Sequence, residues 1–385
     1  MSMTGESSAW KKIKGLLINL LLLTVTLCVL AIVAEICLPL LKNRAIEESV
    51  YSTRRPVVSH IYRAYHPKIG FTLQKNLRNV RLFYPGKLDY TVDSNNHGFR
   101  GPDWDLSAKR KNIVVLGDSF AMGWGVQWEE TMGQVLEKEL QKTDPAYQVI
   151  NLAISGYDLE HMIRLIELYK DVLKPVAVVY AFCPNDLHIL DLKDIKKISA
   201  TEYDLEYHPK PDDEKKLRAL IARQQPDYWS LEKFRRTSYV AACIRIIKPL
   251  FIKEIRTLLK IDVVPEGYNF PKPIPPPAKA TLDEEHKQFF LYGLNRLKKN
   301  IGDTPLYLID VGSKKTLNQK DTADNPRWVL YEFSEQNKPS VTFVDFESLI
   351  RNTPDGRKFH LEYDDHWSAV GHATAAHLIR KKMTL

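Results

Sequence analysis

A serine that could act as a nucleophile follows directly on a short apolar segment. The segment Ile113–Leu116 is rich in β-branched residues and is bounded by Gly117, a pattern typical of a buried strand in a parallel sheet. Open α/β sheets place their chemistry just outside the carboxyl ends of the strands. Ser119, in the sequence Gly117-Asp118-Ser119-Phe120, stands at such a point. To attack a carbonyl group, a serine needs a base, a group that orients the base, and hydrogen-bond donors for the oxyanion.

Three further segments carry polar side chains near predicted strand ends. Leu152–Gly156 follows one predicted strand, Cys183-Pro184-Asn185-Asp186 follows the next, and Asp364-Asp365-His366-Trp367-Ser368 opens the last predicted helix. The carboxyl ends of parallel strands meet at one edge of a sheet. We therefore expect these segments to converge on Ser119.

The residue types in these segments fit nucleophilic catalysis. His366 is the candidate base, because a neutral imidazole can accept a proton and return it. Asp364 is the candidate for orienting His366, and Asp365 is the alternative carboxylate. A metal site built from His366, His372, His377 and the two aspartates is the competing interpretation. The six- and five-residue spacings do not put all three histidines on one helix face.

The combination of segments resembles the SGNH (GDSL-type) hydrolase family over roughly residues 90–380, apart from an insertion. The matching motifs, in chain order, are Gly117-Asp118-Ser119, Gly156, Asn185-Asp186 and Asp364 with His366. The resemblance implies a three-layer α/β sandwich with a parallel, flavodoxin-like sheet. It implies a serine hydrolase with Ser119, Asp364 and His366 as catalytic residues. The implied oxyanion hole consists of the Ser119 and Gly156 backbone N–H groups and the Asn185 side chain, and no cofactor or metal is implied.

Two departures from the family pattern concern the site. The usual Asp-x-x-His block has Tyr363 at its first position, so the block reads Asp-x-His-Trp instead, a form similar to that of a branch that includes alginate acetylation proteins. Pro184 stands where the family often has glycine. Neither change removes a reacting group. Upstream, the segment Asn96–Gly101 looks like the one that precedes the first strand in membrane-anchored members.

Alternating strand and helix patterns begin at residue 112 and predict a parallel sheet covered by helices on both faces. The predicted strands are Ile113–Leu116, Gln148–Asn151, Ala177–Phe182, Leu306–Val311 and Val341–Asp345. The predicted helices are Glu129–Gln141, Leu159–Asp171, Leu282–Asn300 and Ala369–Lys381, and Thr281 with Glu284 forms a capping box before the third. Alternating runs at Val80–Tyr84 and Leu88–Val92 predict edge strands or a small hairpin.

The N-terminal region predicts a membrane anchor. Gly15–Ala34 contains no charged residue, and about 20 apolar residues cross a bilayer core as a helix. The apolar region is longer than that of a signal peptide and is followed by no Ala-x-Ala cleavage site. Three lysines precede the span, and Lys42 and Arg44 follow it, which favours an N-terminus inside the cell.

These observations predict the organisation of the chain. Residues 1–14 are a cytoplasmic N-terminus, 15–41 a single transmembrane helix, 42–110 an extension with short strands, and 111–385 the SGNH hydrolase-like domain. Within that domain, 188–280 is an insertion or lid with an apolar-basic helix around Tyr239–Leu259, which packs on the domain or lies on a membrane surface. The expected location is the inner membrane, with the C-terminal domain periplasmic or otherwise extracytoplasmic.

The net charge and the cysteine content limit which binding partners, disulfides and metal sites are expected. The formal net charge is +8, but no zinc-finger spacing, Arg-rich arm or ribonucleoprotein motif accompanies it, so nucleic acid is not an expected partner. An anionic membrane surface, an acidic glycan or an ordinary solvated surface each accounts for the charge. The four cysteines form neither a disulfide framework nor a zinc pattern, and nothing argues for a Cys183–Cys243 bridge.

Three functions fit the sequence. The first is a membrane-anchored esterase that removes acyl groups, with acetyl expected, from a cell-envelope carbohydrate. The second is an O-acyltransferase that passes the acyl group to a sugar and is supplied by a multipass membrane acyltransferase. The third is a non-catalytic subunit of a membrane complex that keeps the fold.

Overall fold

The computed structural model describes residues 8–37, 62–84, 88–187, 198–199, 202–206, 208, 210–224, 240, 243, 284–317, 325–362 and 364–384. Its contacts divide the chain into two compact units. The first comprises Met1–Val58 with Gln224–Tyr268, and the second comprises Ser59–Arg223 with Asn269–Leu385. The segments that carry the candidate site residues all lie in the second unit.

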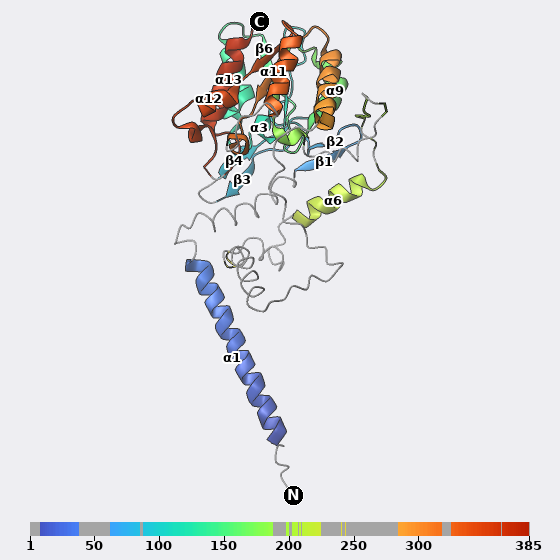
Figure 1. Cartoon of the computed structure of the whole chain (residues 1–385). Coiled ribbons are helices and arrows are strands. Elements are labelled where there is room, and N and C mark those ends of the chain that lie inside the picture. Colours follow the sequence, from blue (N-terminus) through green and yellow to red (C-terminus); the bar gives the residue numbers. More distant parts are fainter. Residues whose placement is uncertain are drawn as a thin grey trace. The chain divides into compact units, whose positions relative to one another are not determined.

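The first unit contains one long apolar helix, α1 (Ser8–Cys37) (Figure 1). Its span Lys14–Cys37 has a mean hydropathy of 2.9, and its leucines, valines and isoleucines are exposed on all sides. The hydroxyls of Thr24 and Thr26 bond to carbonyls one turn earlier, so these polar groups are satisfied within the helix. By length and composition, α1 can cross a membrane. Residues 38–41 of the predicted anchor lie outside the described part.

The second unit is built on a five-stranded parallel sheet with the strand order β6-β5-β7-β8-β9. The strands are β5 (Lys111–Gly117), β6 (Tyr147–Asn151), β7 (Ala177–Phe182), β8 (Leu306–Asp310) and β9 (Val341–Val344). Their apolar runs are almost fully buried, as expected for strands covered on both faces. In chain order of the strands this is the flavodoxin-like order 2-1-3-4-5, so the predicted fold class is confirmed.

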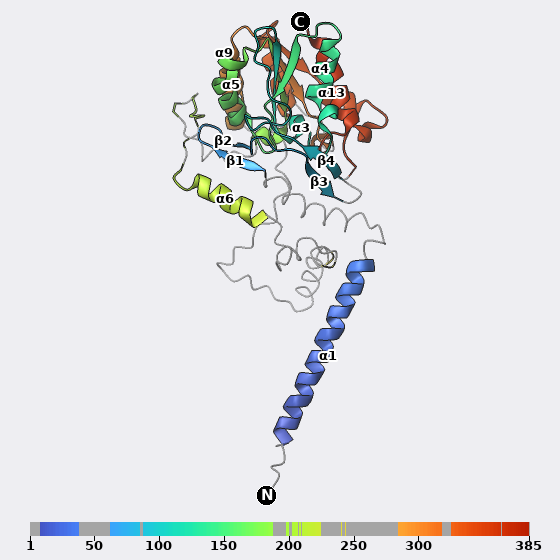
Figure 2. The ribbon, with the colours of Figure 1, turned by 180° about the vertical axis from the view of Figure 1, so that it is seen from behind.

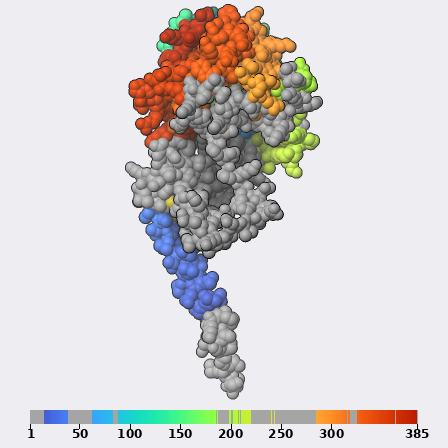
Figure 3. Space-filling model, viewed as in Figure 1, coloured from blue at the N-terminus to red at the C-terminus, as the bar shows by residue number. Residues whose placement is uncertain are grey.

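Helices cover both faces of this sheet (Figures 1 and 2). α4 (Met132–Gln141) packs against α13 (Ala369–Lys382) on one face, and α5 (Leu159–Leu173) packs against α9 (Glu284–Ile301) on the other. α11 (Pro326–Gln336) lies beside α9 and β9. In the view of Figure 3, α9 and the C-terminal helices form much of the visible surface of this unit.

Short elements complete the unit. Two antiparallel hairpins precede the sheet, and further helices, most of them one or two turns long, lie between the larger elements. They are β1 (Arg63–His66), β2 (Gly70–Leu73), β3 (Val80–Tyr84), β4 (Leu88–Val92), α3 (Ser119–Met122), η2 (Trp128–Glu130), η3 (Pro184–Leu187), α6 (Asp213–Gln224), α10 (Lys314–Leu317), α12 (Phe346–Arg351) and η5 (Gly356–Phe359). Both views place the hairpins at the same end of the unit as α3 (Figures 1 and 2).

The structure corrects several predicted elements. The helix predicted over Glu129–Gln141 is divided at Thr131, whose extended backbone ends η2 and whose hydroxyl caps α4. Asp345 is not a strand residue but the N-cap of α12. The β1–β2 hairpin, α6, α11 and α12 were not predicted. The helix predicted around Tyr239–Leu259, the Thr281 cap and most of the 188–280 insertion lie outside the described residues.

Trp367 anchors the start of α13 in the core. Its side chain is fully buried, its indole N–H donates to the Val311 carbonyl at 2.7 Å, and its ring packs edge-on against Phe120 and Phe346. A buried carbonyl without a donor costs about 1–3 kcal/mol. Trp367 therefore fixes the segment that follows β8 against the segment that carries His366.

We expect Trp367→Phe to lower the free energy of unfolding by about 1–3 kcal/mol, because Val311 loses its donor. Trp367→Ala should lower it by about 3–5 kcal/mol, because a large cavity is added. Urea unfolding of the full chain in detergent, followed by far-ultraviolet circular dichroism, measures both. The exposed Leu106 is the control: Leu106→Ala should change the value by less than about 0.5 kcal/mol. Equal effects at the two positions would contradict this assignment.

Candidate active site

Ser119 is presented by a tight turn between β5 and α3. A Cβ on Gly117 would lie 2.6 Å from the Ala121 Cβ, so only glycine lets the helix begin this close to the strand. The Asp118 carboxylate caps α3 by accepting the Phe120 N–H at 2.9 Å. Ser119 is the first residue of α3, and its N–H therefore has no acceptor within the helix. The turn therefore presents the Ser119 hydroxyl and the Ser119 backbone N–H close to each other.

Ser119, His366 and Asp364 form one chain of hydrogen bonds. The distance from Ser119 Oγ to His366 Nε2 is 2.6 Å, and the distance from His366 Nδ1 to Asp364 Oδ1 is 2.5 Å. Only 7% of Ser119, 3% of His366 and 5% of Asp364 is exposed. With Asp364 ionised, the histidine is protonated at Nδ1 and accepts the serine proton at Nε2. This is the arrangement that nucleophilic catalysis by serine requires.

The two adjacent aspartates have different partners. Asp364 Oδ1 accepts both the ring N–H and the backbone N–H of His366. Asp365 instead accepts the backbone N–H of Lys314, at the start of α10, and the Lys314 ammonium donates to the Leu361 carbonyl at 2.6 Å. Asp365 therefore holds the loop in place, while Asp364 orients the imidazole.

Trp124 is a site residue that sequence reasoning missed. Its indole N–H donates to Asp364 Oδ2 at 3.3 Å, and its ring lies 5.7 Å from that of His366. Asp364 therefore has acceptor bonds on both oxygens, which fixes the plane of its carboxylate. Trp124 lies two residues after the end of α3. The segment that begins with Ser119 therefore also supplies a hydrogen bond to Asp364.

Arg100 holds the segment that contains Trp124. Its buried guanidinium donates to the carbonyls of Met122, Gly123 and Val126, and to Thr91 on β4. Burial lowers the Arg100 pKa to about 10. Arg100 belongs to the upstream segment Asn96–Gly101 that the sequence had singled out, and its charge is met by backbone dipoles. Through Arg100, that segment holds the loop that follows α3 in place.

The loop that contains Gly156 is held against α3, the helix that begins with Ser119. Asn151, at the end of β6, donates to the Ala121 carbonyl at 2.8 Å, and the Ser155 N–H points at the Met122 sulfur at 3.3 Å. Gly156 has φ +86°, a backbone conformation that favours glycine. Among the described residues, the Gly156 N–H has no hydrogen-bond acceptor. This N–H is available to a ligand.

The third predicted oxyanion donor is described only by its backbone. Asn185 lies in η3, directly after β7, and its side chain falls outside the described part of the structure. The neighbouring Asp186 is buried and accepts from the Tyr180 hydroxyl at 2.8 Å and from the Cys183 N–H at 3.0 Å. Burial and the nearby Asp118 raise the pKa of Asp186 well above its ordinary value. Asp186 thus holds the turn that carries Asn185.

The three histidines of the metal interpretation have separate partners. His372 is buried on α13, accepts the Met132 N–H at 3.1 Å, and has its pKa lowered to about 3 by burial. His377 Nε2 lies 3.6 Å from Glu139 on α4, away from the His366 contacts. Among the residues that the structure describes, no three His, Cys, Asp or Glu side chains are grouped as metal ligands.

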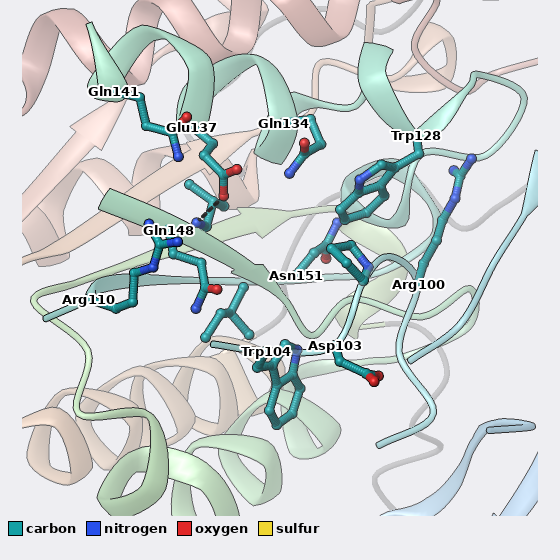
Figure 4. A pocket seen from close by; sticks show the side chains of 13 residues that line it. Arg100, Asp103, Trp104, Arg110, Trp128, Gln134, Glu137, Gln141, Gln148 and Asn151 are labelled. Carbon is teal, nitrogen blue, oxygen red and sulfur yellow. Dashed lines mark hydrogen bonds between the residues drawn. The ribbon is translucent and has the colours of Figure 1, made fainter. Parts of the chain in front are cut away.

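A small pocket lies elsewhere, along the edge strand β6 (Figure 4). Its volume is about 100 Å³, and Trp104, Trp128 and several amide side chains line it. The Glu137 carboxylate accepts the Val149 N–H at 2.7 Å, and Gln141 donates to the Tyr147 carbonyl at 2.9 Å. These contacts satisfy the free edge of the sheet. Ser119 and His366 do not line this pocket, so it is separate from the candidate site.

Comparisons with known proteins give distant similarities. No protein-family profile and no curated protein matches the chain. Among solved structures, it is similar to a lipase/acylhydrolase from Enterococcus faecalis, with 15% identity, a TM-score of 0.36, and coverage of 70% of this chain and 94% of that one. It is also similar to the esterase EstA from Pseudoalteromonas sp., with 11% identity, a TM-score of 0.35, and coverage of 71% and 96%.

We expect Asp364→Asn to slow the reaction of Ser119 with a fluorophosphonate probe by about 10³–10⁴-fold, because the amide no longer favours the Nδ1-protonated imidazole or stabilises its cation. Asp365→Asn is the matched control. Its amide oxygen still accepts the Lys314 N–H, so labelling should stay within about threefold of wild type. Stopped-time labelling with gel or mass detection measures both rates. A larger loss in the Asp365 variant would reassign the orienting carboxylate.

Trp124→Phe should slow the same labelling about two- to tenfold, since one hydrogen bond to Asp364 Oδ2 is lost. The variant keeps an aromatic ring beside His366, so the packing changes little. In an Asp364→Asn background the added loss should shrink, because the two residues act through one carboxylate. A full additional loss in the double variant would show that Trp124 does not act through Asp364.

Proposed function

We propose that this protein is a membrane-anchored serine esterase that removes acyl groups from a cell-envelope carbohydrate, with acetyl as the expected acyl group. The observation that carries the proposal is the continuous hydrogen-bond chain from Ser119 through His366 to Asp364 at the carboxyl edge of the sheet. The order of the motifs, which resembles that of SGNH hydrolases, supports the same reading. The catalytic roles of Ser119, Asp364 and His366 are part of this proposal.

The reaction proceeds through an acyl-serine intermediate. Ser119 Oγ forms a bond to the ester carbonyl carbon as its proton passes to His366 Nε2, and the carbonyl oxygen becomes an oxyanion. The Ser119 and Gly156 N–H groups, together with the Asn185 side chain, bind that oxyanion. The carbon–oxygen bond to the sugar then breaks, and the sugar oxygen takes the proton from His366. A water molecule then gives a proton to His366 Nε2 as its oxygen bonds to the acyl carbon. The bond from that carbon to Ser119 Oγ breaks, Oγ takes the proton back from His366, and the acyl group leaves as a carboxylic acid.

The apolar helix α1 supports the location of this activity. A helix that is apolar on all sides suits a bilayer, and the lysines before it favour an N-terminus in the cytoplasm. The α/β unit then lies outside the cytoplasm, on the periplasmic side of the inner membrane. An ester-bearing envelope polysaccharide is the substrate available to an enzyme in that position.

Transfer to a sugar is the alternative fate of the acyl-serine. The resemblance of the Asp-x-His-Trp block to that of alginate acetylation proteins favours transfer. Trp367, however, is fully buried and bonds to Val311, so it forms no acceptor platform. We therefore place hydrolysis first. A supplying multipass membrane acyltransferase belongs to the transfer alternative.

Labelling with a fluorophosphonate probe and turnover of an activated acetyl ester test the proposal on the full chain in detergent. Wild type should be labelled and should hydrolyse the ester, and Ser119→Ala should lose both by at least about 10³-fold. Equal labelling of the two proteins, or none of folded wild type, would favour a non-catalytic subunit. Added acetyl-free oligosaccharides should leave the rate and the acetate yield unchanged; acetylated oligosaccharide as the main product would establish transfer.

A further inference from the structure

The β1–β2 hairpin of the N-terminal extension is bonded directly to the loop that carries Gly156. The Arg63 guanidinium donates to the Ser155 carbonyl at 2.5 Å, and the Tyr157 hydroxyl donates to the Phe71 carbonyl at 2.6 Å. The Arg63 guanidinium also lies 3.9 Å from the centre of the Phe71 ring, a cation–π contact that fixes its position. The hairpin therefore supports this loop from one side.

The bond from Arg63 controls the peptide group that holds the proposed oxyanion donor. The Ser155 carbonyl and the Gly156 N–H belong to the same peptide plane, and that peptide is trans. In a trans peptide the C=O and N–H bonds point in opposite directions. A donor held on Ser155 O thus directs the Gly156 N–H to the other side of the loop, where it has no acceptor among the described residues. Hydrogen bonds through one peptide also polarise each other, so the N–H becomes a stronger donor.

The absence of a side chain at Gly156 makes room for the Arg63 guanidinium. A Cβ at Gly156 would lie 2.7 Å from Arg63 Nη2, and the residue has φ +86°. Any side chain would push the guanidinium off the Ser155 carbonyl. The glycine therefore serves the approach of Arg63 as well as the turn itself.

The guanidinium of Arg63 lies without a carboxylate partner in the part of the chain that the structure describes. Its Nε–H is buried without an acceptor among the same residues. Desolvation lowers its pKa to about 10, so the group stays charged at neutral pH. A cation that is left without a counter-ion favours negative charge that develops nearby.

We propose that Arg63 is a positioning residue of the oxyanion hole. It orients the Ser155–Gly156 peptide so that the Gly156 N–H meets the oxyanion, and its charge supports that anion through the peptide. The inference rests on the proposed esterase function. It makes the N-terminal extension, outside the sheet, a part of the catalytic machinery.

The test compares kcat and KM of Arg63→Met, Arg63→Lys and wild type with p-nitrophenyl acetate, using the full chain in detergent. Arg63→Met should lower kcat about 10–100-fold, below the roughly 10²–10³-fold cost of losing a direct donor, with KM within twofold. Arg63→Lys should recover part of kcat, since the ammonium keeps the charge and one bond. Binding of a trifluoromethyl ketone, which forms a tetrahedral adduct, should weaken in parallel with kcat.

The control is Arg81→Met on β3, which removes an exposed ion pair with Asp89 from the same extension and should keep kcat within twofold. Melting temperatures check folding; if Arg63→Met does not fold, the neutral variant Arg63→Leu decides, and wild-type kcat in that folded variant overturns the inference. Unchanged kcat in folded Arg63→Met also overturns it, as does a rise in KM alone. Absence of turnover and labelling in wild type would overturn the proposed function and this inference together.

Discussion

The hydrogen bond between Ser119 and His366 joins residues that lie 247 positions apart in the sequence. The packing of the α/β unit brings these two side chains together. The parallel sheet brings the end of β5 to the same edge as the loop before α13. Trp367, immediately after His366, is fastened to the end of β8 through Val311. Ser119 and His366 are thereby held by the core itself. Both side chains are nearly excluded from water, and their mutual interaction is stronger in such surroundings.

Two arginines from the segment before the sheet hold the loops next to Ser119. Arg100 binds the backbone carbonyls of the loop after α3, and Arg63 binds the carbonyl beside Gly156. Both guanidinium groups donate their hydrogen bonds to backbone carbonyls, so each arginine fixes the path of a loop. The extension therefore holds two loops in place, the one that follows α3 and the one that carries Gly156.

The sequence was sufficient for the elements that follow simple patterns. Buried β-branched runs such as Ile113–Leu116 predicted the sheet, and the predicted meeting of Ser119 with His366 and Asp364 is observed. The sequence named Asp364 with Asp365 as the alternative, and the structure distinguishes these adjacent carboxylates by their partners: Asp364 bonds to His366, and Asp365 bonds to Lys314. Trp124 and Arg63 were missed because their partners lie 240 and 92 residues away in the sequence. No local sequence pattern predicts such contacts. The four-residue helix α3 is too short to leave a periodicity.

The central claim is that Ser119 carries the acyl group during the reaction. Mass spectrometry of the full chain, mixed with an activated acetyl ester and quenched in acid within milliseconds, tests it most directly. The account predicts one acetyl group on the peptide that contains Ser119, formed and lost at rates that match turnover. Turnover without an acetylated Ser119 peptide, or an acetyl group that accumulates on another residue at the turnover rate, would contradict it.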